Sequence, residues 1–236
     1  MKVVILAGGK GTRLAPYTVV FPKPLMPLED IPILEVVIRQ LRYYGFSEIF
    51  LAVGHLSELI RSYFNNGHRF GLNIHYSIER DPLGTAGPLT LITDLDEPFL
   101  VMNGDILTDM DYRVLCQYHI VSKAAATIAT HKRVVKIDLG VVTSSNENRI
   151  VDYTEKPTFD YLVSMGIYVF DPSVMKYIEP EQRLDFPELV LRLIKAGELV
   201  LSYPYEGYWL DIGRPDDYAQ AIEEFSNMRS RFLPGE

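Results

Sequence analysis

Cysteine and basic residues are scarce in this sequence, and each shortage excludes a class of protein. The chain has one cysteine among 236 residues, so it cannot form an internal disulfide or a cysteine-based zinc cluster. Acidic residues outnumber basic ones by 31 to 23, which gives a formal net charge of −8 at pH 7. DNA- and RNA-binding proteins need basic surface, so we expect no nucleic-acid partner. A phosphate ligand remains compatible because it requires only a few local cations.

Long apolar runs and internal repeats are also absent. No stretch approaches the length of about 18 apolar residues that spans a bilayer. The apolar start of the chain, residues 1–7, is too short for a signal sequence and is followed at once by glycines and a lysine. The overall fraction of apolar residues, 47%, is typical of a folded globular protein. We therefore expect a cytoplasmic protein with no membrane contact.

The periodicity of apolar residues predicts alternating strands and helices in the first half. Strands are predicted at 2–6, 48–53, 72–78 and 98–103, and helices at 32–44, 56–64, 85–95 and 112–121. Such an order is typical of a mostly parallel, doubly wound sheet. Beyond residue 125 strands follow one another more closely, at 125–130, 139–142, 149–153, 165–170 and 199–203, with helices at 186–197 and 215–228. This spacing suggests antiparallel additions or a small second lobe.

A glycine-rich loop follows the first predicted strand. Residues 6–14 read LAGGKGTRL, in which three glycines allow backbone N–H groups to face phosphate oxygens. Arg13 would add a bidentate, charge-assisted contact. The loop is not a Walker A motif, because Lys10 precedes Gly11, and Leu14 replaces the third glycine of a dinucleotide fingerprint. A plain strand-to-helix turn is the alternative, but two cations within the loop favour a phosphate site.

Two lysines precede prolines, which restrict the backbone around them. Lys23 lies between Pro22 and Pro24, and this bracing would direct its ammonium group to a fixed point. The alternative is a solvated lysine in a proline-rich loop. Lys156 stands between Glu155 and a proline. It could hold a second phosphate while Glu155 accepts sugar hydroxyls, although a charged turn is the simpler interpretation.

Two aspartates are candidates for a metal site. Asp105 follows the predicted strand 98–103, and ligands of open α/β sheets bind beyond the carboxyl ends of strands. Asp211 interrupts an apolar run, where a charge is costly unless it is paired or bound to a metal. Two carboxylates with phosphate oxygens and waters suit Mg²⁺. A turn-capping role for Asp105 and an ion pair between Asp211 and Arg214 are the alternatives.

Seven segments together resemble the sugar-1-phosphate nucleotidylyltransferases, in the order found in that family. They are LAGGKGTRL at 6–14, FPKPL at 21–25, PLGTAG at 82–87, NGD at 103–105, EKP at 155–157, MGIYVF at 165–170 and WLDIGRPDDY at 209–218. The resemblance implies a Rossmann-like three-layer α/β sandwich with a mixed, mostly parallel central sheet. It also implies a Mg²⁺-dependent reaction in which a sugar 1-phosphate attacks the α-phosphorus of a nucleoside triphosphate and pyrophosphate leaves.

The resemblance assigns roles within a single nucleotidyltransferase domain over 1–236. A nucleotide-binding half, 1–110, would contact the triphosphate through Leu6, Ala7, Gly8, Gly9, Gly11, Thr12, Arg13, Lys23, Glu79, Pro82, Gly84, Thr85, Ala86 and Asp105. A sugar-phosphate-binding half, 111–236, would act with Asn103 and Gly104 through Gly140, Glu155, Lys156, Gly166 and Asp211. The catalytic residues would be Arg13, Lys23 and Asp105, and the Mg²⁺ ligands would be Asp105 and Asp211.

The PLGTAG segment is most similar to the branch that makes GDP-mannose and GDP-manno-heptose. Glu79, just before it, could accept both N1–H and N2–H of guanine, unless it pairs with Arg80. We therefore favour GTP with a manno-configured hexose or heptose 1-phosphate. The alternatives are a uridylyl- or thymidylyltransferase, transfer to a non-sugar phosphate such as phosphocholine, and a non-catalytic nucleotide-sugar-binding homologue. No hexapeptide repeat follows residue 228, so we expect a short member without a C-terminal β-helix, for which the resemblance allows a homodimer.

Overall fold

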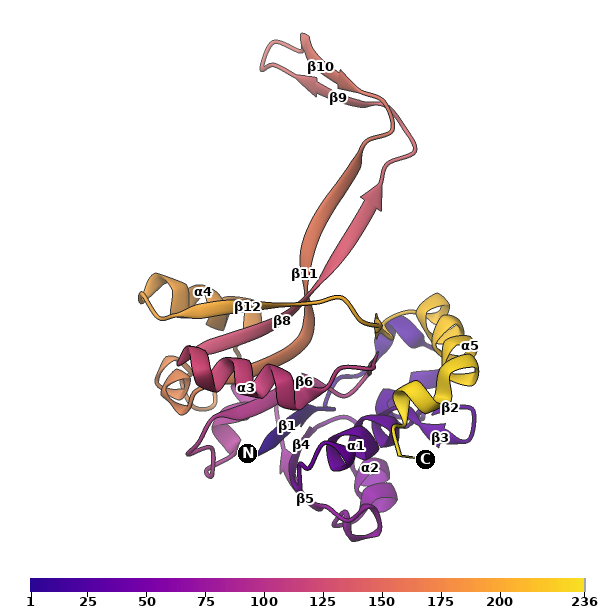
Figure 1. The fold of residues 1–236 in the computed structure, drawn as a ribbon, viewed down its shortest axis with the longest axis vertical. Helices are drawn as coiled ribbons and strands as arrows, with labels where there is room; N and C mark the ends of the chain where they lie inside the picture. Colours follow the sequence, from indigo (N-terminus) through magenta and orange to yellow (C-terminus); the bar gives the residue numbers. More distant parts are fainter. Residues whose placement is uncertain (236) are drawn as a thin grey trace.

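The computed structural model of this chain, which describes residues 1–235, is built on one seven-stranded sheet (Figure 1). The strands are β1 (Val3–Leu6), β4 (Glu48–Val53), β5 (Asn73–Ile78), β6 (Phe99–Asn103), β8 (Ala126–Lys136), β11 (Thr158–Phe170) and β12 (Val200–Tyr205). They lie side by side in the order β12-β8-β11-β6-β1-β4-β5. Only β11 pairs antiparallel with its neighbours, β6 and β8, and the remaining pairs are parallel. The predicted mixed, mostly parallel sheet is confirmed.

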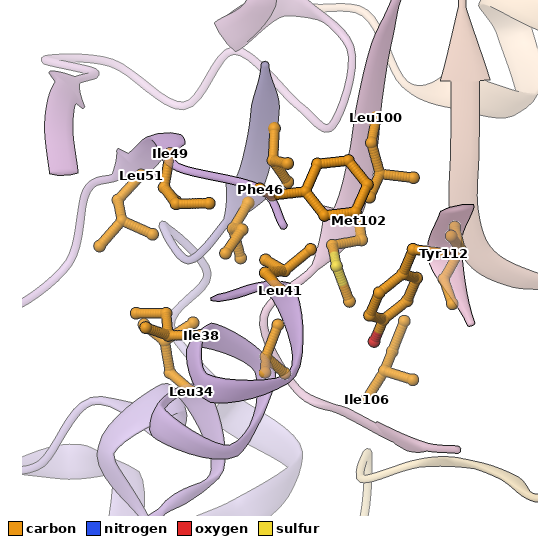
Figure 2. Close-up of a cluster of buried hydrophobic side chains, with 14 of the residues drawn as sticks. Leu34, Ile38, Leu41, Phe46, Ile49, Leu51, Leu100, Met102, Ile106 and Tyr112 are labelled. Carbon is orange, nitrogen blue, oxygen red and sulfur yellow. The ribbon is translucent and has the colours of Figure 1, made fainter. Parts of the chain in front are cut away.

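Helices cover both faces of the sheet because its central strands are apolar on both sides. Val3 and Ile5 of β1 join the core on one face, where α1 (Ile33–Tyr43), α2 (Ser57–Phe64) and α3 (Tyr112–Ser122) pack. Figure 2 shows part of this core, with Leu34, Ile38 and Leu41 of α1 facing the strands. Val4 joins the opposite core, against α4 (Phe186–Lys195). The structure is therefore the expected three-layer sandwich.

A third apolar cluster lies around the last helix, α5 (Pro215–Phe232). Phe225 and Phe232 pack there with residues of two short strand pairs, β2 (Pro27–Leu28) with β3 (Ile31–Pro32) and β7 (Ile106–Thr108) with β13 (Trp209–Asp211). This packing fixes the chain segments that flank the candidate site. Within residues 1–235, no helix is both long enough and apolar enough to cross a membrane.

The predicted helix over 85–95 is wrong. The segment forms only a short 3₁₀ helix, η5 (Gly87–Leu91). The backbone N–H groups of Ala86 and Gly87 both donate to the carbonyl of Leu184, at 2.9 and 3.1 Å. A tertiary contact therefore fixes the start of this segment, and Gly87 and Pro88 are the two residue types with the lowest helix propensity.

The strands predicted at 125–130 and 165–170 are correct in place but much too short. β8 and β11 remain paired far beyond the sheet, from Thr130↔Ser164 to Lys136↔Thr158. A hairpin of β9 (Val141–Ser144) and β10 (Ile150–Thr154) continues this ribbon. Figure 1 shows the ribbon projecting from the body, and we call residues 132–163 the arm. The expected antiparallel additions therefore form an extended arm rather than a compact second lobe.

Candidate functional site

The glycine-rich loop and Asp105 lie at the same edge of the sheet. β1 and β6 are parallel neighbours, and the pairing Leu6↔Asn103 brings their carboxyl ends together. The N–H of Gly104 donates to the carbonyl of Leu6 at 2.9 Å, which fixes one segment against the other. The two motifs therefore meet beyond the carboxyl ends of these strands, as expected, and we call this region the crevice.

Lys23 reaches this crevice and pairs with Asp105. Its ammonium group donates to Oδ2 of Asp105, and the lysine as a whole is only 8% exposed. Pro22 holds extended backbone immediately before the short 3₁₀ helix η3 (Lys23–Leu25). The interpretation as a solvated lysine is excluded, since the side chain is buried in an ion pair.

Asp211 is brought beside Asp105 by the pairing of β7 with β13. Asp211 lies opposite Ile106, and the N–H of Ile212 donates to the carbonyl of Asp105 at 3.2 Å. Desolvation by surrounding protein raises the pKa of the Asp211 carboxyl, and the charge of Asp105 raises it further. Among residues 1–235, no salt bridge joins Asp211 to Arg214, so the predicted alternative role is not observed. Strands of three residues are too short for apolar periodicity to reveal them.

Arg13 approaches the same pair of carboxylates from the glycine loop. A Cβ atom placed on Gly213 would lie 3.4 Å from Nη1 of Arg13. The positive charges of Lys23 and Arg13 lower the pKa of Asp211, against the effects of desolvation and Asp105. Two cations and two carboxylates thus converge at the end of the sheet.

The loop between Arg13 and Lys23 is held close to the glycines. Gly11 has φ +62°, in the left-handed region that favours glycine. A Cβ there would lie 3.0 Å from the Thr18 side chain and 3.2 Å from Cβ of Lys23. The hydroxyl of Thr18 also donates to the Gly11 carbonyl at 2.7 Å. Glycine is therefore required at position 11 both by the turn and by the close approach of this loop.

The two carboxylates fit a small, hard cation. Oδ1 of Asp105 is buried and has no hydrogen-bond partner within the protein, so one oxygen in the crevice is left to accept a ligand. Its neighbour Asp211 is exposed and accessible to a ligand, and desolvation and the charge of Asp105 raise the pKa of its carboxyl. In the described part of the chain, no cluster of three or more histidine, cysteine or acidic side chains could form a metal cage. A site with few protein ligands is the type that Mg²⁺ prefers.

Glu79 lies on the other side of the glycine loop. It follows β5, and a Cβ on Gly8 would lie only 2.4 Å from its Oε1 atom. Its Oε2 atom accepts a hydrogen bond from the N–H of Leu83 at 3.0 Å. No salt bridge to Arg80 occurs among residues 1–235. Glu79 is thus anchored beside Gly8 by backbone contacts.

The segment 82–87 contacts the N-terminal end of α4. Thr85 Oγ1 accepts a hydrogen bond from the N–H of Phe186 at 2.8 Å, and the Thr85 N–H donates to Asp185 at 3.0 Å. Ala86 is completely buried. These contacts give Thr85 and Ala86 a structural role, and they hold the backbone of this segment near Glu79.

Asn103 and Gly166 meet on the sugar-phosphate side of the expected site. Gly166 has φ +72°, and a Cβ on it would lie 2.6 Å from Nδ2 of Asn103. Nearby, the indole N–H of Trp209 donates to the carbonyl of Met165 at 3.0 Å. Gly166 therefore allows β11 to pass close to the carboxyl end of β6.

The remaining sugar-phosphate candidates lie in the arm. Gly140 faces Tyr153, since a Cβ on Gly140 would lie 2.1 Å from the Tyr153 hydroxyl. That hydroxyl donates a hydrogen bond to Glu155 at 3.2 Å. Lys156 has φ +47°, a left-handed conformation at the end of the arm hairpin. Within the described residues, the hydrogen bonds and salt bridges of segment 137–157 all join it to the arm itself. The structure does not bring Gly140, Glu155 and Lys156 to the carboxylates of the same chain.

Comparison with known proteins agrees with this geometry. The sequence profile of the nucleotidyl transferase family matches residues 2–227. The chain belongs to the nucleotidyl transferase family. Members of this family are also among the proteins it resembles in sequence and in structure.

Two curated proteins show the range of the family. A UTP–glucose-1-phosphate uridylyltransferase of Synechocystis is 37% identical over 94% of this chain. A mannose-1-phosphate guanyltransferase of Yarrowia lipolytica is 35% identical over 92% of it. The chain spans 62% of the length of each of these relatives. A crystal structure from Bacillus anthracis, provisionally assigned as a glucose-1-phosphate thymidylyltransferase and bound to sucrose, superposes with a TM-score of 0.76 at 26% identity, covering 94% of both chains.

Proposed function

We propose that this chain transfers a nucleotidyl group from a nucleoside triphosphate to a sugar 1-phosphate, with Mg²⁺ as the metal. The observation that carries the proposal is the convergence of Arg13, Lys23, Asp105 and Asp211 beside a glycine-rich loop at one end of the sheet. Transfer at phosphorus needs positioning and charge neutralisation more than covalent help from the protein. Both requirements are met by these residue types.

The protein binds and orients the triphosphate in this proposal. Backbone N–H groups of the glycine loop and the guanidinium of Arg13 contact its oxygens. Lys23 neutralises the charge that develops on the departing pyrophosphate. An oxygen of the sugar phosphate forms the new bond to the α-phosphorus, and the bond from that phosphorus to the bridging oxygen of pyrophosphate breaks. No general base is needed because the attacking oxygen is already an anion.

Asp105 and Asp211 would hold the metal. Oδ1 of Asp105 is the free acceptor. A cation beside Asp211 would stabilise its ionised carboxylate, whose pKa the protein raises. A bound Mg²⁺ would supply charge neutralisation and alignment of the phosphates. The lysine at position 23 keeps Asp105 oriented when the metal is absent.

Guanine is the base that we propose, with a manno-configured hexose or heptose 1-phosphate as acceptor. Glu79 lies beside Gly8, where a carboxylate could accept both N1–H and N2–H of guanine. The similarity to a mannose-1-phosphate guanyltransferase supports this choice, and the similarity to a uridylyltransferase supports the alternative of UTP. Glu79→Gln should reduce the preference for GTP over UTP by at least about tenfold, because one half-buried acceptor becomes a donor. Unchanged selectivity would contradict the role of Glu79.

A matrix assay of pyrophosphate release tests the proposal. GTP, UTP, dTTP, ATP and CTP are each combined with a panel of sugar 1-phosphates, with Mg²⁺ or with EDTA. Release with GTP and a manno-configured sugar, abolished by EDTA, supports the reaction and the branch together. Release only with UTP or dTTP would keep the reaction and reject guanine. Silence across the panel with nucleotide still bound would reject catalysis and favour the non-catalytic homologue.

A further inference from the structure

The arm exposes an unusual amount of apolar surface for its size. Its exposed large apolar residues are Val134, Val135, Leu139, Val142, Ile150, Val151, Tyr153, Phe159, Tyr161 and Leu162. Residues 132–163 contain five basic and five acidic side chains, so the arm is neutral while the rest of the chain carries the whole net charge of −8. A large exposed apolar surface of this kind marks a site of protein association.

One face of the arm ribbon is aromatic and runs toward the crevice. Pairing of β8 with β11 places Val135 opposite Phe159 and Arg133 opposite Tyr161 on that face. The rings of Phe159 and Tyr161 are 6.4 Å apart. The same face continues to His131, whose ring lies 5.5 Å from Trp209.

The expected sugar-phosphate residues of the arm are out of reach of their own crevice. Gly166 lies against Asn103 at the crevice, and Lys156 is ten residues earlier in the chain. At about 3.3 Å per residue, an extended strand separates the two by about 30 Å. No lysine side chain spans that distance. The crevice of a single chain therefore contains the proposed triphosphate-binding residues but not that chain's own Lys156.

Folding of the arm back onto its own crevice would disturb the ribbon. The ladder between β8 and β11 is continuous from Thr130↔Ser164 to Lys136↔Thr158. The register shift between Ser164 and Tyr168 lies at the base of the arm, beside the crevice. A second copy of the chain could meet the arm without breaking any of these pairs.

The body of the protein has a matching apolar surface at the rim of the crevice. Tyr17, Val19, Val20 and Phe21 are all exposed, with Val20 at 76%. These residues belong to the loop that connects Arg13 to Lys23, and the Tyr17 ring lies 6.5 Å from that of Tyr218. We call these four residues the rim patch. An arm docked on the rim patch would end close to the carboxylates.

We propose that the arm of one copy crosses to a second copy, docks its aromatic face on the rim patch there, and completes that site with Lys156 of the partner subunit. Two-fold symmetry makes the exchange reciprocal, so that each subunit gives one arm and receives another. A stable interface of this kind buries about 800 Å² per partner, and the two reciprocal contacts would share that area. The role of Lys156 rests on the proposed nucleotidyl transfer. The exchange of arms is inferred only from the exposed apolar surfaces of the arm and the rim patch.

Complementation between two inactive variants tests the exchange. Asp105→Asn disables the crevice and keeps the arm, and Lys156→Ala disables the arm and keeps the crevice. Each variant alone should lose at least about a hundredfold in turnover. Co-expressed with different affinity tags and isolated as the mixed dimer, the pair should recover about half of the wild-type activity, because one of two symmetric sites is complete. A mixed dimer no more active than its parents would overturn the proposal.

The mass in solution tests the exchange independently of activity. Light scattering should give about twice the chain mass of 26.9 kDa for the wild type. Phe159→Glu with Tyr161→Glu should yield a monomer, while Leu162→Glu, on the opposite face of the ribbon, should leave the dimer intact. A monomeric wild type would overturn the exchange even if the enzyme were active. The wild type could instead be inactive but dimeric, with Phe159→Glu and Tyr161→Glu together making it monomeric. That result would reject the proposed function and keep the exchange of arms.

Discussion

The pair formed by Lys23 and Asp105 gives the sharpest prediction about the site. Lys23→Met removes the buried ammonium group but keeps a side chain of similar length. Asp105 would then keep a carboxylate with no cation on Oδ2, no partner on Oδ1 and a second carboxylate nearby. Removing one partner of a buried pair costs about 3–5 kcal/mol, and we expect about 3 kcal/mol because the Asp105 side chain remains 22% exposed. For a domain of this size the melting temperature should fall by about 6–12 °C.

Thermal unfolding of four metal-free proteins checks this reasoning. Lys23→Met is compared with the wild type, with the double variant Lys23→Met/Asp105→Asn, and with Lys10→Met. The double variant should recover most of the lost stability, because the unpaired carboxylate is gone. Lys10 is an exposed lysine of the glycine-rich loop, and its change should alter stability by less than about 0.5 kcal/mol. An unchanged melting temperature for Lys23→Met, or no recovery in the double variant, would refute the account of the pair.

Two further predictions concern Asp211 and a pair of glycines. Asp211→Asn should reduce turnover at least about a hundredfold yet raise the metal-free melting temperature at neutral pH. Folding raises the pKa of the Asp211 carboxyl, so its ionised form lowers the stability of the folded protein. This loss of stability is absent at pH values below the pKa in the unfolded chain. It grows as pH rises from there through the higher pKa in the folded protein. The advantage of asparagine should therefore vanish near pH 3, and an equal advantage at all pH values would contradict it. Gly84→Ala should destabilise by about 2–4 kcal/mol, because φ is +81° and the new Cβ would lie 2.5 Å from the carbonyl of Leu184. Gly197→Ala, at φ +77° with open space around it, should cost only about 1 kcal/mol when both variants are compared by denaturant titration.

The parts of the fold that sequence periodicity predicts well are those buried on both sides. Residues 48–53 form β4 with the predicted bounds, and 33–43 form α1 inside the predicted range. Their apolar residues repeat because each element has a core to face. The helix expected at 85–95 failed because Gly87 and Pro88 disfavour a helix there, and the carbonyl of Leu184, nearly a hundred residues away, fixes the backbone of Ala86 and Gly87.

The arm shows where local patterns stop being informative. Residues 131–136 and 158–164 alternate weakly and have no core beneath them, so the sequence predicted the two long strands only up to Thr130 and from Met165. The short strands predicted at 139–142 and 149–153 do lie close to β9 and β10. The same segment carries Gly140, Glu155 and Lys156, whose family roles suggested a place beside the metal site. Sequence order contains no information on how far an exposed ribbon projects.

The candidate site was predictable because its parts follow strands. Asp105 and the glycine loop come directly after parallel neighbours, which meet at one edge of the sheet. Asp211 was predicted as a charge in an apolar run and through the family resemblance, and its position depends on the pairing of β13 with β7, which local sequence does not reveal. The rim patch was missed because four exposed apolar residues in a loop have no periodicity.

Phosphorus NMR of a single reaction mixture tests the central claim most directly. Wild-type protein is incubated with GTP, mannose 1-phosphate and Mg²⁺, with Asp105→Asn as the matched control. The account predicts that the signals of GTP and the sugar phosphate decline together while those of pyrophosphate and a sugar diphosphate linkage grow in equal amounts, and that the control shows none of this. Loss of GTP with the sugar phosphate unchanged, or equal turnover by Asp105→Asn, would contradict the claim that these two carboxylates and their cations transfer a nucleotidyl group.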